Sequence, residues 1–502
     1  MATADTTDAA YEELLERYER ISAINGASGV LGWDQQTMMP DDGTPARSAQ
    51  LSALSGISHD LMTDDEFGDL LDQLEDDDLD PEQEAVVREL RFRYDRAVEV
   101  PEDLVQELTE TSSEANQIWQ NAKADDEFEQ FAPTLETIRD LHVERAEHID
   151  PDKNPYLVMH EGGERDIPIE KVEDIFGTLR EELVPLIEEI KENGDDLPAP
   201  FAERGPYDAD KQEELSRDAL DLLNFDWDRG RLDVSPHPFT SGNQFDTRIT
   251  TRFREDDFLG SLTASIHEFG HATYQLGLPQ EEFGSPLGES RSAGVHESQS
   301  RFWENHVGRT REFWELFLPR VKEHFPELED VSVDEAYAAV NRIYPENLIR
   351  VEADELTYHM HIILRYEIGR SFVEGDLNVD EIPQVWNEKM EEYLGVTPDT
   401  DTNGCLQDIH WTGGFAAFQG YTIGSVLAAQ LDAAMRRDID DVDEKIRNGE
   451  FEPMLSWMRE NVHSHGQRYR ADQLIEEATG EPLTAEYFVD YAKDKFTDLY
   501  GL

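Results

Sequence analysis

Two histidines flank a glutamate in the stretch "SIHEFGHATYQ" (265–275). On a helix His267 and His271 would be one turn apart, so their imidazoles would leave the same face about 6 Å apart along the axis. One metal ion can bridge that separation. Glu268 would lie beside the first histidine, where its carboxylate can reach a water activated by the metal without binding the metal itself. The spacing therefore predicts a metal centre with Glu268 as its general base.

A catalytic zinc ion needs a third protein ligand and one open position for water. The nearest good donor is Glu297 in "SAGVHESQSRFWENHVG" (292–308), where we expect a second helix. His296 would point about 100° away from Glu297 on that helix, so only one of the two can face the metal. Glu297 could instead form an ion pair with Arg301, one turn later. Spacing alone leaves Glu297, Glu304 and His296 all open as the third ligand.

Further polar side chains recur at steps of three and four in "NLIRVEADELTYHMHIILRYEIGR" (347–370), which we expect to be one helix. The stripe consists of Arg350, Asp354, Tyr358 or Thr357, His361 and Arg365. One interpretation is a buried ion-pair ladder in which Arg350 pairs with Asp354. The other is that a guanidinium of this stripe binds a free carboxylate, because arginine is the best bidentate donor for that group.

Two residues nearer the C-terminus are candidate donors to an oxyanion: His410 in "QDIHW" and Tyr421 in "GYT". His410 could equally be a core histidine beside Trp411, and Tyr421 could simply pack. Asp246 and Arg248 of "DTRIT" could line the substrate, or they could pair with each other across a turn.

The helix that carries the two histidines has clear ends. "DDFLGSLTASIHEFGHATYQLGLP" (256–279) begins with acidic residues and ends with Gly277 and Pro279, which predicts a helix near 257–276. Gly270 in its middle costs about 1 kcal/mol relative to alanine. Its missing side chain could admit a packed neighbour or the backbone of a substrate.

Segments with a 3.6-residue period dominate the chain, for instance 11–24, 173–193 and 424–437. Strand-like alternation is scarce, and its best candidates lie in 231–253, where we expect a short hairpin or small sheet beside the site. These patterns predict an all-α, mainly helical fold. No repeat or flexible linker divides the 502 residues, so we expect one catalytic unit over 1–502, with two lobes about a cleft as a further expectation.

The composition excludes several partners. Lys and Arg total 43 against 113 Asp and Glu, a net charge of −70 that repels nucleic acids and anionic lipid surfaces. Such self-repulsion must be screened by abundant cations, so we expect a protein adapted to molar salt. Cys405 is the only cysteine and is more plausible as a structural residue than as a nucleophile. The N-terminus lacks the features of a signal peptide, and no apolar run suits a membrane helix, which predicts a cytoplasmic protein.

Eight motifs, taken together, resemble the thermostable carboxypeptidase Taq family of metallocarboxypeptidases. They are "LGWDQQTMMPDDGTPARSAQ" (31–50), "HPF" (237–239), "DTRIT" (246–250), "HEFGH" (267–271), "HESQSRFWEN" (296–305), "IRVEADELTYHMHI" (349–362), "GCLQDIHW" (404–411) and "GYTIGSVLAAQL" (420–431). They run across almost the full chain in the order that the family has.

The resemblance implies an activity and a set of roles. The expected activity is release of single amino acids from the C-terminus of peptides, with broad specificity and proline disfavoured. The expected cofactor is one divalent ion per subunit, Zn²⁺ or Co²⁺, at the bottom of a long groove in a helical homodimer. The implied residues are His267, His271 and Glu297 as metal ligands, Glu268 as base, Arg350 as carboxylate anchor oriented by Asp354, and His410 and Tyr421 as further catalytic groups.

Two other functions are compatible with parts of the sequence. A thimet-type zinc oligopeptidase also carries "HEFGH" but cuts internally, and the order of motifs after Glu297 disfavours it. An inactive zinc-binding helical protein would need neither Glu268 nor the stripe that contains Arg350.

Overall fold

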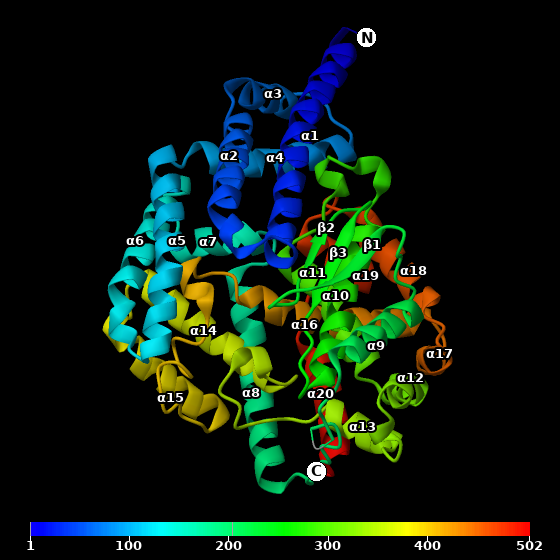
Figure 1. Cartoon of the computed structure of the whole chain (residues 1–502). Helices are drawn as coiled ribbons and strands as arrows, with labels where there is room; N and C mark the ends of the chain where they lie inside the picture. The colour runs from blue at the N-terminus through cyan, green and yellow to red at the C-terminus, as the bar shows by residue number, and fades with distance from the viewer. Residues whose placement is uncertain (1, 203) are drawn as a thin grey trace.

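The computed structural model describes residues 2–202 and 204–502, and within them it shows twenty α-helices and one three-stranded sheet (Figure 1). The predicted all-α, mainly helical fold is therefore confirmed. Among the described residues, no helix combines the length and the apolar character that a membrane span requires.

The first four helices pack on a small core of their own at one end of the molecule (Figure 1). They are α1 (Ala2–Thr37), α2 (Thr44–Met62), α3 (Asp65–Glu75) and α4 (Pro81–Val98). Leu14 of α1, Phe67 and Leu71 of α3 and Leu90 of α4 are fully buried in this core. Asp80 caps α4 by accepting hydrogen bonds from two amides of its first turn, which is why the helix begins there.

The remaining helices contribute to one large core. They are α5 (Glu102–Asp125), α6 (Ala132–Ile149), α7 (Pro155–Glu164), α8 (Ile169–Asn193), α9 (Ala209–Leu222), α10 (Phe258–Gly277), α11 (Ala293–Arg301), α12 (Arg311–His324), α13 (Val333–Val340), α14 (Thr357–Glu374), α15 (Ile382–Leu394), α16 (Gln419–Asp438), α17 (Val442–Asn448), α18 (Glu452–Asn461), α19 (Ala471–Thr479) and α20 (Glu486–Tyr500).

The sheet lies where the sequence predicts it. Strand β3 (Thr247–Thr251) is central, with β1 (Gly230–Val234) parallel on one side and β2 (Thr240–Gly242) antiparallel on the other. Both β2 and β3 contact α10, so the sheet is packed directly against the helix that carries the two histidines. The fully buried Ile249 of β3 faces the core there.

Two glycines let three helices meet at close range. A methyl group on Gly270 of α10 would lie 2.4 Å from the carbonyl oxygen of Gln299 and 2.5 Å from Cα of Ser300, both in α11. A methyl group on Gly424 of α16 would lie 2.4 Å from Cγ of Glu297. The missing side chain of Gly270 therefore admits a packed neighbour, which is one of the two alternatives that the sequence leaves open.

The prediction of one continuous helix over 347–370 is wrong for the first part of that range. Helix α14 begins only at Thr357, and Arg350 lies in a separate short 3-10 helix, Arg350–Glu352. The carboxylate of Asp354 accepts hydrogen bonds from the amides of Leu356 and Thr357 and from the hydroxyl of Thr357. An acceptor that captures these amides starts a helix at this point, so residues before it leave the helical path.

Candidate metal centre

Helices α10 and α11 bring His267, His271 and Glu297 together. One donor atom from each residue lies within 4.8 Å of the others. Oε2 of Glu297 is 3.8 Å from Nε2 of His267 and 3.4 Å from Nε2 of His271. The three side chains are 18%, 15% and 8% exposed, so the cluster is sheltered but reachable. Two imidazole nitrogens and one carboxylate are a donor set that suits a divalent ion with an open position.

The other nitrogen of each imidazole is held by an acceptor. Nδ1 of His267 lies 2.9 Å from Oε2 of Glu304, and Nδ1 of His271 lies 3.1 Å from the carbonyl oxygen of His296. Because the carboxylate of Glu304 only accepts hydrogen bonds, Nδ1 carries the proton in neutral His267. The carbonyl of His296 favours the same form of His271, whose Nδ1 also lies 2.7 Å from Nδ1 of His296. The lone pair is then on Nε2, which faces Glu297, as a ligand requires.

Glu297 is ionised and held in place by a cation. Nε of Arg301 donates to its Oε1 at 2.7 Å, which leaves Oε2 directed to the imidazoles. Burial alone would raise the pKa of Glu297, but Arg301, then His267 and His271, outweigh it and hold that pKa far below its usual range. The ion pair with Arg301 and the approach to the histidines were alternatives in the sequence, and the structure contains both.

The two other candidate ligands lie on the outer side of the imidazoles. Glu304 is in a π-helical turn, Phe302–Gly308, and contacts Nδ1 of His267 and the side chain of Arg309. His296 lies against Nδ1 of His271 at 2.7 Å, and burial, with His271 next in effect, lowers its pKa to about 3. Both residues therefore contact the Nδ1 side of the two imidazoles.

Glu268 is buried beside the cluster, and its carboxylate is fixed by the sheet. Oγ1 of Thr240, on the edge strand β2, donates to Oε2 of Glu268 at 2.6 Å. Thr240 is 28 residues from Glu268, and sequence reasoning did not find it. A threonine in a "HPFT" stretch carries no pattern that points to a distant glutamate.

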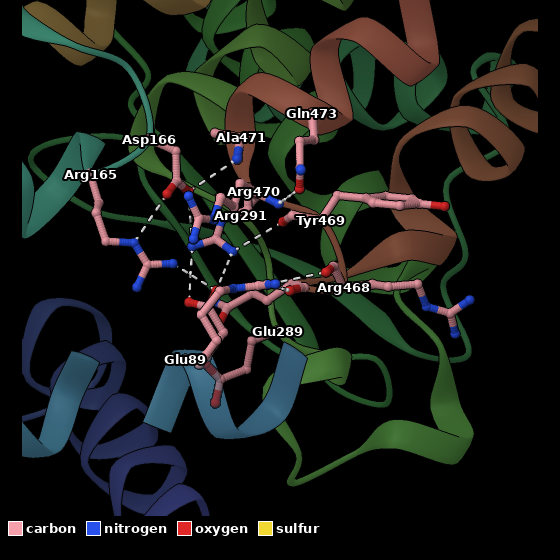
Figure 2. Close-up of polar contacts among 12 residues, drawn as sticks. Glu89, Arg165, Asp166, Glu289, Arg291, Arg468, Tyr469, Arg470, Ala471 and Gln473 are labelled. Carbon is pink, nitrogen blue, oxygen red and sulfur yellow. Dashed lines mark hydrogen bonds and ion pairs between the residues drawn. The ribbon is translucent and has the colours of Figure 1, made fainter. Parts of the chain in front are cut away.

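The segment that leads into α11 is tied to the N-terminal helices by charge (Figure 2). Both terminal nitrogens of Arg291 lie 3.0 Å from the carboxylate of Glu89 on α4, and Arg165 contacts the same carboxylate at 2.7 Å. Arg291 also lies 3.6 Å from Asp166. Burial would raise the pKa of Glu89, yet Arg291, then Arg165 and Arg88, lower it to about 2.

Arg350 is buried against Asp408, and the expected pairing with Asp354 is wrong. Oδ1 of Asp408 accepts from Nε and Nη2 of Arg350 at 3.1 and 2.9 Å. Oδ2 of the same carboxylate pairs with the fully buried Arg365. Asp354 is occupied by the amides of Leu356 and Thr357 at the start of α14 and by the amide of Tyr344 at 2.8 Å. Asp408 lies in the "QDIHW" motif, but no local pattern points to its role as the shared partner of two arginines.

An aromatic layer joins Arg350 to the metal cluster. The guanidinium of Arg301 lies 4.7 Å above the ring of Tyr358, whose centroid is 6.4 Å from that of Tyr421. Arg350 lies 5.8 Å above the Tyr421 ring. Burial, followed by the effect of Tyr358, raises the pKa of Tyr421 to about 12, so its hydroxyl keeps its proton and can donate it in a hydrogen bond.

His410 lies next to this layer and is one-third exposed. Its Nδ1 is 3.8 Å from Asp408, and its ring centroid is 4.8 Å from that of Phe418. Burial, then Arg350, lowers the pKa of His410, which makes the neutral ring the resting form. Trp411, the neighbour that the core interpretation invoked, instead donates its indole N–H to the carbonyl of the buried Cys405 at 2.8 Å.

Asp246 and Arg248 pair with each other, as one of their two interpretations states. Arg248 donates to both carboxylate oxygens of Asp246 at 3.0 and 2.7 Å. Its guanidinium also lies 4.3 Å above the ring of Trp33, from the N-terminal "LGWD" motif. These contacts join strand β3 to α1.

Comparison with known proteins assigns the chain to a family. Residues 13–496 match the family described as carboxypeptidase Taq (M32) metallopeptidase. The chain is 39% identical to thermostable carboxypeptidase 1 of Thermus thermophilus, over 99% of this chain and 100% of that protein. It is 35% identical to carboxypeptidase 1 of Bacillus subtilis, over 98% and 99% of the two chains.

A solved structure of an M32 carboxypeptidase has the same fold as this chain. The M32 carboxypeptidase of Deinococcus radiodurans R1 superposes with a TM-score of 0.95 at 36% identity, covering 98% of this chain and 100% of that one. The chain belongs to the carboxypeptidase Taq (M32) family of metallopeptidases and is a metal-dependent carboxypeptidase.

Proposed function

We propose that the protein removes amino acids one at a time from the C-terminus of peptides, with His267, His271 and Glu297 holding one divalent ion per subunit. The observation that carries this proposal is the convergence of two Nε2 atoms and one carboxylate oxygen within 4.8 Å, with both Nδ1 atoms already occupied. The donor set fits Zn²⁺, our first choice, and Co²⁺ equally. The ion, when bound, polarises the scissile carbonyl and lowers the pKa of a water molecule.

In the proposed mechanism Glu268 handles the protons. Its carboxylate takes a proton from the attacking water and returns it to the amine that leaves as a free amino acid. The hydroxyl of Thr240 holds one oxygen of that carboxylate at 2.6 Å, which fixes the direction of the other. Tyr421 and His410 donate hydrogen bonds to the oxyanion that develops on the carbonyl.

Arg350 is the proposed anchor for the free C-terminal carboxylate. Two buried arginines, Arg350 and Arg365, share the single carboxylate of Asp408, which leaves an excess positive charge beside the aromatic layer. A substrate carboxylate would balance that charge. Asp354 contributes only by starting α14, which carries Tyr358. We also propose that the Asp246–Arg248 pair lines the substrate path. Strand β3 adjoins β2, whose Thr240 hydrogen-bonds the carboxylate of Glu268.

One assay separates this function from its rivals. The purified protein, in high salt, is incubated with a defined peptide with and without chelator, and the products are identified by mass. Stepwise, chelator-sensitive loss from the C-terminus supports the proposal. An internal cut would indicate a thimet-type oligopeptidase, and no product would indicate an inactive zinc-binding protein. The variant Glu268→Gln should retain the metal and lose nearly all turnover.

The anchor has its own test. Peptides with a free C-terminus and their amidated forms are compared in the wild type and in Arg350→Ala, which should chiefly weaken the use of free C-termini. Equal cleavage of both forms by the wild type would contradict the assignment. A panel of C-terminal residues in the same assay tests broad specificity with proline disfavoured.

We further propose a cytoplasmic homodimer adapted to molar salt, in which residues 1–502 form one catalytic unit of two lobes. The net charge of −70 supports the adaptation to salt. A melting temperature that did not rise between dilute buffer and molar KCl would argue against it. Sedimentation in that buffer would test the dimer.

A further inference from the structure

A cavity of about 740 Å³ opens beside His410. Its walls come from the end of α4 with Arg96, from α6 with His142 and Arg145, from α7 with Val158, and from the loop at 412–417. That loop, "TGGFAA", contributes mainly small residues, which leave the cavity open. The lining therefore combines two arginines with small, uncharged groups of the loop.

The two arginines of this cavity lack a balancing carboxylate. From α4 to α8, six arginines form ion pairs: Arg88, Arg91, Arg93, Arg139, Arg165 and Arg180. Among the described residues, Arg96 and Arg145 are the two arginines of these helices with no ion pair. The chain has 113 acidic and 43 basic side chains, so a surface cation readily meets an anion.

Arg96 and Arg145 both line the cavity, and Arg96 is fixed there by the backbone. Nη2 of Arg96 donates to the carbonyl of Val158 at 2.9 Å, a neutral partner. Burial, then Arg145, lowers the pKa of Arg96, while Glu161 opposes this weakly and is itself paired with Lys153. The side chain of Arg145 is exposed to solvent and forms no ion pair with a described residue, whereas that of Arg96 is partly buried. The cavity is thus lined by two guanidinium groups that no described carboxylate contacts directly.

Further polar atoms at the cavity lack partners. Within the described residues, Nε2 of His142 is buried without a hydrogen bond, and Nδ1 of His410, which faces Asp408 at 3.8 Å, also has none. Burial, followed by the effect of Arg145, lowers the pKa of His142 to about 4, so its ring is neutral. Such orphan atoms beside unpaired cations are typical of a site that a ligand completes.

The cavity adjoins the proposed carboxylate anchor. His410 lines the cavity and lies 3.8 Å from Asp408, which holds Arg350. The ring of Phe418 lies 4.8 Å from that of His410, and the guanidinium of Arg350 lies 5.6 Å above the same Phe418 ring. His410 and Phe418 thus connect the proposed anchor to the cavity, and a peptide whose terminus is bound at Arg350 would place its last side chains toward it.

We infer that the cavity binds the carboxylate of an acidic side chain, Asp or Glu, in one of the last two residues of the peptide substrate, through Arg145 and Arg96. The inference rests on the proposed function and adds a specificity determinant to it. A guanidinium is the preferred donor for a carboxylate, and here its charge is not already satisfied.

Two pairs of blocked peptides test it. One pair ends in Ala-Glu or Ala-Gln, and the other ends in Glu-Ala or Gln-Ala, so each pair differs only by a charge. For each pair, kcat/KM of the Glu peptide is divided by kcat/KM of the Gln peptide, with both measured at one fixed salt concentration. We expect Arg145→Gln to lower this ratio by about tenfold for one of the pairs, as the loss of a charge-assisted hydrogen bond predicts. The amide peptides should be cleaved as by the wild type.

Matched variants separate charge recognition from a structural effect. Arg139→Gln removes the same charge from the same helix, but Arg139 is paired with Asp140 and does not line the cavity, so the ratio should not change. Arg145→Lys should recover part of the preference, and Arg145→Glu should lower the ratio further. Ratios in Arg145→Gln equal to those of the wild type for both pairs would overturn the inference. Failure of the wild type to shorten the amide peptides would instead contradict the proposed function, and the inference would fall with it.

Discussion

Gly424 on α16 is a position at which helix packing directly constrains Glu297, the proposed metal ligand. In the variant Gly424→Ala the new methyl carbon would lie 2.4 and 2.5 Å from Cγ and Cβ of Glu297, and 3.0 Å from its carbonyl carbon. Carbon atoms in contact prefer about 3.5–4.0 Å. Either α11 moves away by about 1 Å, or the Glu297 side chain leaves the imidazoles.

A second glycine variant separates the cost of overpacking from the stability that alanine adds to a helix. Overpacking of this kind costs about 1–3 kcal/mol, whereas replacing a helical glycine by alanine contributes about 1 kcal/mol of stability. Gly177 of α8 has nothing within 4 Å of an added methyl group, so Gly177→Ala reports the helix contribution alone. The free energy of unfolding of Gly424→Ala should therefore be about 1–3 kcal/mol below that of Gly177→Ala.

The decisive measurement is metal affinity. Displacement of one ligand by about 1 Å should weaken binding at least tenfold, comparable with the effect of removing a group that orients a ligand. Competition with a chelator measures this for both alanine variants, with denaturant unfolding in parallel. If Gly424→Ala were as stable as Gly177→Ala and bound the metal as tightly as the wild type, close packing of α16 would not be what positions Glu297.

Three further changes test other parts of the structure. Glu304→Gln, which leaves a weaker acceptor at Nδ1 of His267, should lower metal affinity about 10- to 100-fold in the same chelator competition. Asp408→Asn leaves two buried guanidinium groups without a carboxylate and should cost about 3–5 kcal/mol in denaturant unfolding. The pKa of Glu89 is about 2 in the folded protein and 4.5 as its ordinary value, so the unfolded state binds more protons between these values. Stability should fall by about 3 kcal/mol as the pH drops from 5 to 2, and Glu89→Gln should flatten that part of the curve in pH-dependent unfolding.

The helical period accounts for what the sequence predicts well. His267 and His271 share a face because four residues make about one turn, and the ends of α10 follow from its capping residues. The small sheet follows from turn residues and β-branched side chains between 231 and 253. These features depend on neighbours a few residues away, so local physics is enough to predict them.

Contacts between elements required the folded chain. Spacing left Glu297, Glu304 and His296 open as third ligand, and only the crossing of α10, α11 and α16 separates their positions. Asp408 is 58 residues from Arg350, and no local period relates them. The early start predicted for α14 fails because Asp354 captures amides that the pattern assigned to the helix.

The sequence alone therefore determined which residues can do chemistry, on which helix, and in what order along the chain. Tertiary structure decided which of them meet, because the approach of two helices depends on the volume of side chains that are distant in sequence. The close approach of α11 to α10 and α16, permitted at Gly270 and Gly424, sets the position of Glu297 opposite two imidazoles.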